Sequence, residues 1–295
     1  YAILQRWYND KELYHYLGFL FFNFKAQTPF RDIYTQWKAL NSRDKFLKDI
    51  QHTIATRMLD RYLEETEKAA PDYQKCLKTM TEAISDFREN WYNNDKELYQ
   101  ILILLDIFRI LDSKSIKKLP TDYFTRKSGQ KDGEDKEHIL SQTPRKDNGE
   151  ITTIKTDWEK FVQSEDFKDI RSQMQDILNH SDAELTEQEL IQLQNLLNSA
   201  GLNSIGNMAL LDLRINRSYG NADYTHKRTI IFQEYMNQKY VRPHTLAVFM
   251  KGDIDAREAT GIPLNRWTLE DIRRHTDKIP KEIGKNFNAW LTQNN

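Results

Sequence analysis

Three short segments, far apart in the chain, carry side chains that together could hydrolyse a phosphodiester. The first holds the consecutive pair Glu137 and His138, the second holds Asn207, and the third holds Asn216 with Lys227 downstream. Phosphodiester cleavage needs an activated water, a cation beside the phosphate and stabilisation of the leaving oxygen. A neutral imidazole suits the role of base, and carboxylate and amide oxygens suit a hard divalent cation.

The oxygen donors of this set favour Mg²⁺ or Mn²⁺ over Zn²⁺ as the cofactor. Glu137 offers a carboxylate and Asn216 an amide oxygen, whereas zinc sites commonly use thiolates. The chain has a single cysteine, Cys76, which lies in a helix-like stretch without a catalytic partner nearby. We interpret Cys76 as a small buried hydrophobic residue.

Each segment alone is a weak signal. A Gly-Asn pair such as Gly206-Asn207 is commonly a turn before a strand, and an adjacent Glu-His pair is equally unspecific. The order of the three segments is the informative feature, together with the nine positions between Asn207 and Asn216. Aromatic residues at helical spacing, among them Trp91 and Tyr92, are interpreted as core rather than as base-stacking platforms.

The elements that must position these residues are mostly helices. Glycine and proline are scarce, at 10 and 7 of 295 residues, which favours long helices. Hydrophobic spacing predicts helices at 2–24, after Pro29, from an N-cap at Ser42 to about 69, at 72–89 and at 96–111. The fold class predicted is mainly α, a helical bundle with an embedded ββα-metal motif.

The second half of the chain alternates loops with short periodic segments. Residues 117–150 are loop-like with an apolar interruption at 137–140, and 208–213 could be a strand. Helical patterns follow at 157–178, 186–197 and 216–240, and Thr268 could cap a last helix. We expect a helical domain at 1–116, a nuclease domain at 117–240 with a helical insertion at about 157–200, and a segment at 241–295 that packs back on the helical body.

The motifs at the three segments resemble a known family. EHILSQ at 137–142, IGNMALLDLRIN at 205–216 and NADYTHK at 221–227 are similar to the HNH (His-Me finger) domain at the C-terminal end of GmrSD-type restriction endonucleases and related anti-phage proteins. The flanking segments LILLDIFRIL and YVRPHTLAVFMKG resemble the helical body of the same proteins. The resemblance therefore covers most of the chain.

The resemblance implies a role for each candidate residue. His138 would be the general base, Glu137 and Asn216 would hold the metal, and Asn207 would brace the loop that orients the histidine. Lys227 would contact a DNA phosphate. His226 is the alternative metal ligand on the helix.

Three arginines add positive charge next to these motifs. Arg214, Arg217 and Arg228 form a local basic cluster suited to a phosphate backbone. The function expected is thus a metal-dependent DNA endonuclease, nicking or cleaving, of a restriction or phage-defence system.

The sequence departs from the family pattern at several points. Many fingers carry Asp at the position of Glu137 and Pro where Ser141-Gln142 stands here, and the helical insertion at about 157–200 is long. The family's N-terminal half is a ParB-like nucleotide-dependent domain with an Asp-Gly-Gln-Gln-Arg type motif. No such motif occurs here, so that domain or subunit is expected as a partner and its activity is not assigned to this chain.

Composition limits the other classes of function. The net charge is −1, which argues against a protein that coats nucleic acid through bulk charge but allows a local basic groove. A single cysteine excludes a disulfide framework and favours the cytoplasm. The most apolar run, 98–111, contains Asp106 and Arg109 and is too short to span a bilayer, so no membrane partner is expected.

Two alternatives to an active nuclease remain open at the level of sequence. One is a non-catalytic helical module that senses DNA or binds a protein through a degenerate HNH finger. The other is an all-helical interaction protein in which the motif match is chance; a structure without a strand at 208–211 would favour it. Assembly as a homo-oligomer is also left open.

Overall fold

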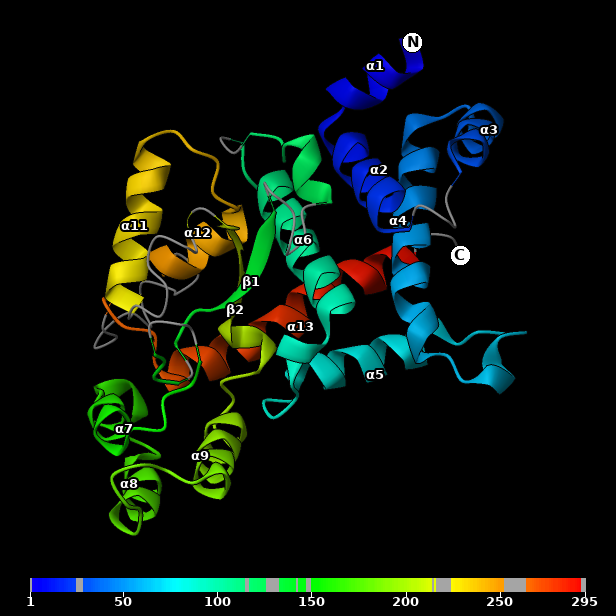
Figure 1. Ribbon diagram of the computed structural model, residues 1–295. Coiled ribbons are helices and arrows are strands. Elements are labelled where there is room, and N and C mark those ends of the chain that lie inside the picture. Colours follow the sequence, from blue (N-terminus) through cyan, green and yellow to red (C-terminus); the bar gives the residue numbers. More distant parts are fainter. Residues whose placement is uncertain are drawn as a thin grey trace. The chain divides into compact units, whose positions relative to one another are not determined.

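The computed structural model describes residues 2–24, 29–114, 117–125, 133–141, 143–146, 150–213, 215, 224–251 and 264–292. In this part of the chain the protein is mainly helical and contains a two-stranded sheet (Figure 1). The predicted mainly α class is confirmed. A strand is also present at 208–212, where the sequence suggested one.

The chain divides into two compact units built from separated segments. The helical unit comprises Tyr1–Ser85, Tyr99–Gln130 and Lys278–Asn295, and the sheet unit comprises Asp86–Leu98 and Lys131–Asp277. The divisions fall within α6 (Asp95–Asp112) and α13 (Leu269–Thr292), so each unit takes part of both helices. The contiguous domain boundaries expected from the sequence stay a prediction.

The helical unit is organised around α4, which contacts α2, α3 and α5. Phe46, Ile50, Ile54 and Met58 of α4 recur every four residues and are all 0% exposed, as expected for the core face of an amphipathic helix. Its elements besides α6 and α13 are α1 (Ala2–Asn9), α2 (Lys11–Asn23), α3 (Phe30–Leu40), α4 (Arg43–Leu59), α5 (Tyr73–Ser85) and the short 3₁₀ turns η2 (Asp60–Tyr62), η3 (Glu65–Glu67) and η5 (Thr121–Phe124).

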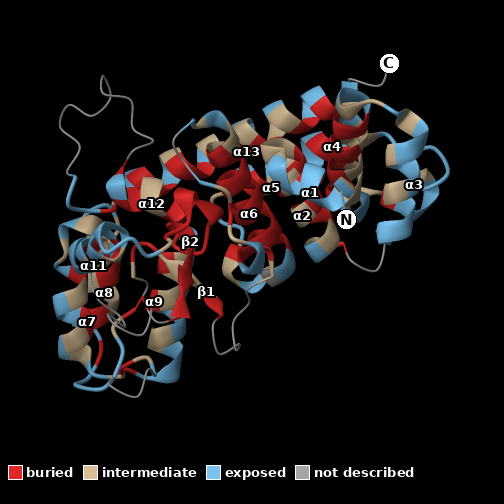
Figure 2. Cartoon of the chain, turned by 90° about the horizontal axis from the view of Figure 1, so that it is seen from above, coloured by how far each residue is buried: buried red, intermediate tan, exposed pale blue. Residues whose placement is uncertain are grey.

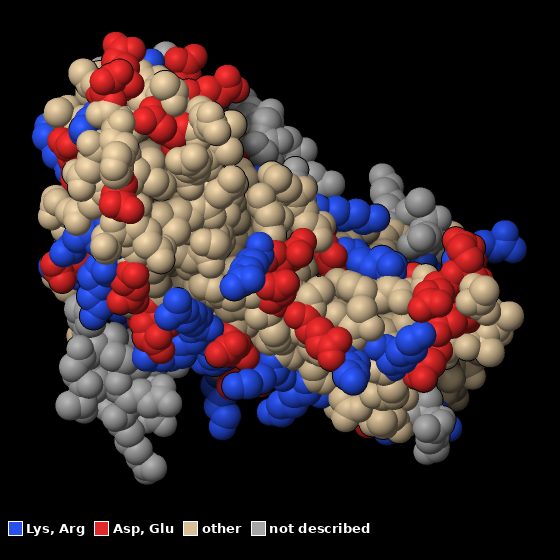
Figure 3. All heavy atoms as spheres, turned by 90° about the horizontal axis from the view of Figure 1, so that it is seen from below, with Lys and Arg blue, Asp and Glu red and all other residues tan. Residues whose placement is uncertain are grey.

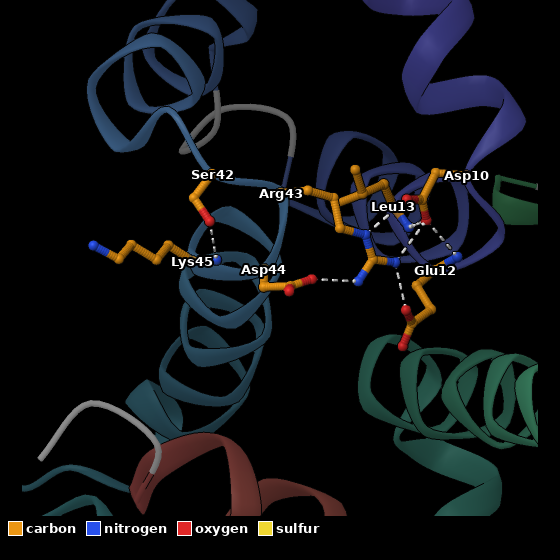
Figure 4. Close-up of polar contacts among 7 residues, drawn as sticks. All are labelled: Asp10, Glu12, Leu13, Ser42, Arg43, Asp44 and Lys45. Carbon is orange, nitrogen blue, oxygen red and sulfur yellow. Dashed lines mark hydrogen bonds and ion pairs between the residues drawn. The ribbon is translucent and has the colours of Figure 1, made fainter.

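Asp10 divides the single helix expected at 2–24 into α1 and α2. Its Oδ1 accepts hydrogen bonds from the backbone N–H groups of Glu12 and Leu13, which makes it the N-cap of α2. Arg43 donates to both carboxylate oxygens of Asp10 and also reaches Glu12 and Asp44 (Figure 4). Burial alone would raise the pKa of Asp10, but the hydrogen bonds from Arg43 and Leu13 lower it overall.

Two other predicted helices begin near the expected residue but end earlier than expected. Ser42 caps α4 as expected, since its Oγ accepts from the Lys45 N–H (Figure 4). However, α4 ends at Leu59 rather than near 69, because the apolar spacing stops there and 3₁₀ turns follow. The helix expected at 157–178 is also interrupted: Arg171 donates to the carbonyl oxygens of Val162 and Ser164 and closes a bend.

The sheet unit holds the strands and the helices that cover them. Its elements are η4 (Trp91–Asn93), β1 (Glu134–His138), α7 (Lys155–Val162), η6 (Glu165–Phe167), α8 (Arg171–Asn179), α9 (Glu187–Ser199), η7 (Ile205–Asn207), β2 (Met208–Asp212), α11 (Tyr224–Met236) and α12 (Pro243–Met250). The helices α7, α8 and α9 form one group in which α8 contacts both of the others (Figure 1). Thr268 and Asp271 bond reciprocally at the start of α13, which confirms the cap expected there.

The two strands pair antiparallel and differ sharply in character. Glu134 faces Asp212 and His138 faces Met208. All five residues of β2 are buried, whereas β1 has the polar sequence EDKEH and is mostly half-buried (Figure 2). β1 lacks an alternating apolar pattern, so backbone pairing with β2 rather than propensity places it.

The core of the sheet unit continues directly from β1. Ile139 and Leu140, which follow His138, are 0% and 4% exposed and belong to a cluster with residues of α7, α8, α9 and β2. Burial of this apolar surface fixes the end of β1, which is where the candidate base lies. Among the described residues, no helix has the length and apolar character to cross a bilayer.

Candidate functional site

His138 is the last residue of β1. Its imidazole ring is contacted at one edge by a polar side chain and on one face by an aromatic ring. Its Nε2 lies 3.0 Å from Oδ1 of Asn203. The ring of Tyr92, from η4, stacks on the imidazole with centroids 4.5 Å apart and planes inclined by 23°. The side chain is half-buried. The histidine therefore has a defined orientation at the edge of the sheet unit's core.

The surroundings of His138 keep its imidazole neutral. Burial lowers the pKa of His138 to about 3, and the nearby charges of Lys227, Arg145 and Lys136 lower it further, whereas the hydrogen bond to Asn203 opposes the shift. A neutral imidazole carries the lone pair that a general base needs. The same three cations make the environment of the ring electropositive, which suits an approaching phosphate.

Asn207 closes the loop after β1 through its fully buried side chain. Its Oδ1 accepts from the Leu140 N–H at 2.8 Å, and its Nδ2 donates to the carbonyl oxygens of Leu140 and Leu202 at 3.0 and 2.9 Å. Its own carbonyl accepts from the Ile139 N–H at 2.9 Å. Asn207 therefore ties the two residues that follow His138 to the start of β2.

Glu137 points away from the side of β1 that carries His138, because successive residues of a strand face opposite ways. Its Oε1 lies 2.6 Å from Nζ of Lys227 on α11, and the same ammonium donates to the carbonyl of His138 at 2.7 Å. The Lys227 side chain is 1% exposed and that of Glu137 18%. Lys227 thus joins α11 to β1 across a mostly buried ion pair.

The structure describes only two of the predicted phosphate-binding residues, Lys227 and Arg228. Lys227 is buried in its pair with Glu137, and Arg228 is half-buried with its Nε donating to the Phe249 carbonyl at 3.0 Å. The alternative ligand His226 is exposed on α11. Asn216, Arg214 and Arg217 lie outside the described residues.

Four residues around His138 were missed by sequence reasoning: Tyr92, Asn203, Lys136 and Arg145. The aromatic spacing predicts a core position for Tyr92 together with Trp91, and nothing in the sequence pattern singles out Asn203. Lys136 lies over the Tyr92 ring at 4.3 Å, and Arg145 is exposed. The spacing from Lys136 to His138, two positions on one strand, puts both on the same face and could have indicated that Lys136 belongs to the site.

The donors present are compatible with a hard divalent ion. Among the described residues no three His, Cys, Asp or Glu side chains converge as a metal cluster. Glu137 presents a partly exposed carboxylate with Oε1 bound to Lys227, and in the described part of the chain no contact engages its Oε2. That oxygen fits an oxygen-ligated ion that keeps several waters and takes few protein ligands.

The charge on one face of the molecule is mixed. On the face shown in Figure 3, Lys and Arg side chains alternate with Asp and Glu rather than forming a large patch of one sign. The net charge of −1 agrees with this pattern. This face therefore offers DNA no broad positive surface, and local groups such as those around His138 would have to supply any attraction there.

Comparison with known proteins identifies one family. No curated protein and no solved structure matches the chain. Residues 78–282, more than half of the chain, match the family of GmrSD restriction endonucleases, C-terminal domain. This range includes β1, β2 and α11 with every candidate residue around His138. The chain therefore belongs to the family of GmrSD restriction endonuclease C-terminal domains.

Proposed function

We propose that this chain is a metal-dependent HNH-type DNA endonuclease whose general base is His138. Membership in a restriction endonuclease family implies a nuclease. The observation that carries the finer assignment is the position of His138: it ends β1 and pairs with Met208, the first residue of β2. In the proposed finger, β1 and β2 would be the two strands and α11, which Lys227 links to β1, would be the helix.

In this proposal the imidazole of His138 takes a proton from the attacking water. Its neutral form is favoured by its surroundings, and a bound phosphate would oppose the three nearby cations and strengthen the base. Asn207 keeps the loop after His138 in place. Lys136 and Arg145 add positive charge where the DNA backbone would lie.

Glu137 and Asn216 would hold Mg²⁺ or Mn²⁺, which supplies positive charge to the scissile phosphate when bound. Lys227 would act mainly by holding Glu137, because its ammonium is 1% exposed. A direct contact of Lys227 with phosphate, as the resemblance implies, would require the ion pair to open. Arg214, Arg217 and Arg228 remain candidates for the DNA backbone.

The cellular setting is part of the same proposal. The chain would act in the cytoplasm, in restriction of phage DNA, together with a ParB-like nucleotide-dependent domain or subunit. The same proposal includes assembly as a homo-oligomer. Nicking and double-strand cleavage are distinguished by the products of the experiment below.

Cleavage of supercoiled plasmid with Mg²⁺ or Mn²⁺ tests the proposal. His138→Ala should lower the cleavage rate about 100- to 10,000-fold, the range for loss of a general base. His180→Ala is the matched control, because His180 is exposed at the end of α8 and should leave the rate unchanged. Full activity of His138→Ala contradicts the proposal.

Calorimetric titration with Mn²⁺ tests the metal site separately. Wild type should bind the ion, and Glu137→Gln should bind it at least about tenfold more weakly, since a neutral amide replaces a charged oxygen ligand. Equal binding by both proteins would remove Glu137 from the metal site. Absence of binding in wild type would favour a degenerate, non-catalytic finger.

A further inference from the structure

The imidazole of His138 is bonded through one nitrogen to a side chain that is itself held. Nδ2 of Asn203 donates to Oδ1 of Asn198 at 2.6 Å. This bond turns Oδ1 of Asn203, an acceptor, toward Nε2 of His138 at 3.0 Å. With the Asn203 amide in this orientation an acceptor faces Nε2, which favours the tautomer with the proton on Nε2 and the lone pair on Nδ1.

The backbone of Asn203 also supports the group that covers the ring. Its carbonyl accepts from the Trp91 N–H at 2.9 Å. The next residue, Tyr92, stacks on the imidazole. Asn203 therefore contacts the imidazole directly and supports the stacked Tyr92 ring indirectly, through the backbone of Trp91. Asn203 itself is 8% exposed.

We propose that Asn203, aligned by Asn198, is a positioning residue that fixes the orientation and tautomer of His138 so that Nδ1 is the atom that receives the proton. The inference rests on the proposed function and, through the orientation of the Asn203 amide, adds to it the atom that acts as base. A general base must be correctly oriented toward the attacking water, since misalignment of a reacting group by about 1 Å can lower the rate about 100-fold. Hydrogen-bond partners of a functional histidine commonly serve this purpose.

The first test observes the imidazole without DNA or metal. In the full chain with ¹⁵N-labelled histidine, the His138 signal is assigned by its loss in His138→Gln. Wild type should show a single tautomer with a slowly exchanging Nε2–H proton. Asn203→Leu removes the acceptor and should speed that exchange at least about tenfold, and Asn203→Asp, which keeps an acceptor, should preserve slow exchange.

The second test measures plasmid cleavage by the same variants. Asn203→Leu should lower kcat about 10- to 100-fold with little change in KM, and Asn203→Asp should recover most of the loss. Should Asn203→Leu fold poorly, the milder pair on α9 decides: Asn198→Ala should lower kcat about threefold or more, and Asn195→Ala, exposed on the same helix, should not.

The outcomes separate this inference from the function on which it rests. Full activity of His138→Ala overturns the proposed function and this inference with it. An inactive His138→Ala beside a fully active Asn203→Leu and Asn198→Ala overturns the inference alone. Unchanged exchange of the Nε2–H proton in Asn203→Leu also overturns it, because the hydrogen bond would then not hold the ring.

Discussion

The Lys227 ammonium lies 2.6 Å from Oε1 of Glu137 and 2.7 Å from the carbonyl oxygen of His138, so a single buried cation joins α11 to the strand end that carries the candidate base. Replacing one member of a buried ion pair leaves the charge of the other without its partner and poorly solvated, which destabilises the fold. We expect Lys227→Met to lower the free energy of unfolding by about 3 kcal/mol, measured by urea denaturation.

A double-mutant cycle with Glu137→Gln tests the origin of that loss. The double variant should be more stable than the sum of the single losses predicts, because neither partner is then left charged and alone. Glu159→Gln is the control and should change stability little, because the Glu159 side chain is exposed and lies 3.9 Å from the half-buried Lys155. Strict additivity would mean that the two groups do not interact in solution.

The buried amide of Asn207 makes a second prediction. Asn207→Asp keeps the acceptor for the Leu140 N–H but loses both donors, and it places a carboxylate against the carbonyl oxygens of Leu140 and Leu202. We expect a loss of about 3 kcal/mol or more in the free energy of unfolding, together with loss of cleavage. Asn195→Asp, at an exposed position of α9, should change stability little, and a stable, active Asn207→Asp would argue against the bracing role.

Local chemistry explains what the sequence predicted well. The caps at Ser42 and Thr268 depend on bonds within three residues of the helix start, so spacing alone identifies them. The strand at 208–212 is a short apolar run after a breaker cluster, which is also a local pattern. The family motifs directed attention to His138 and Asn207 because their order in the chain is characteristic.

The missed residues depend on contacts between distant segments. Asn203 is 65 positions from His138, and Tyr92 is on a different element altogether. The sequence does not show that Asn203, rather than another asparagine nearby, faces the imidazole. It also does not show that Tyr92 stacks on His138 instead of packing in the core. Likewise the apolar spacing at 2–24 runs across the break at Asp10, which caps α2 and is bonded by the distant Arg43.

His15 gives a prediction for acid stability of the helical unit. Its side chain is 0% exposed, Nδ1 donates to the Lys11 carbonyl, and Nε2 accepts from the Leu119 N–H. Burial lowers the pKa of His15 from 6.5 to about 4. Because the folded-state pKa is depressed, the unfolded chain takes up a proton first as the pH falls. The stability contribution is thus complete above pH 6.5 and is lost between 6.5 and about 4.

Comparison of wild type with His15→Gln isolates this effect. The stability advantage of wild type over the variant should shrink by roughly 3 kcal/mol as the pH falls through that window, since one pKa unit corresponds to about 1.4 kcal/mol. Urea denaturation at several pH values measures it. Other histidines titrate equally in both proteins and cancel. Parallel stability curves would show that His15 is not kept neutral by the fold.

Gly206, next to Asn207, is required by close packing rather than by its backbone angles. A Cβ at this position would lie 2.3 Å from the Ile272 carbonyl oxygen and 2.6 Å from the Thr276 backbone nitrogen. Because α13 backbone cannot move cheaply, Gly206→Ala should destabilise the protein by about 2 kcal/mol or more, measured by thermal and urea unfolding. Gly284→Ala, also at α13, meets only Thr81 Cγ2 at 3.4 Å and should be neutral or stabilising.

Arg145 offers a test of DNA binding near His138. It is exposed, and its charge is one of three that lower the pKa of the imidazole, so a phosphate close to the ring would also be close to Arg145. We expect Arg145→Ala to weaken binding of duplex DNA several-fold at low salt and to reduce the slope of log affinity against log salt by about 1, the change for one lost phosphate contact. Fluorescence anisotropy over a salt series measures both quantities.

The control for Arg145 is a cation of the same unit outside the site. Lys168 is exposed after η6, and Lys168→Ala should leave affinity and salt slope unchanged. The effect of Arg145→Ala should also persist in a His138→Ala background, because the arginine contributes charge independently of proton transfer. An unchanged salt slope in Arg145→Ala would place the DNA backbone elsewhere, at groups remote from His138, and would weaken the assignment of His138 as the base.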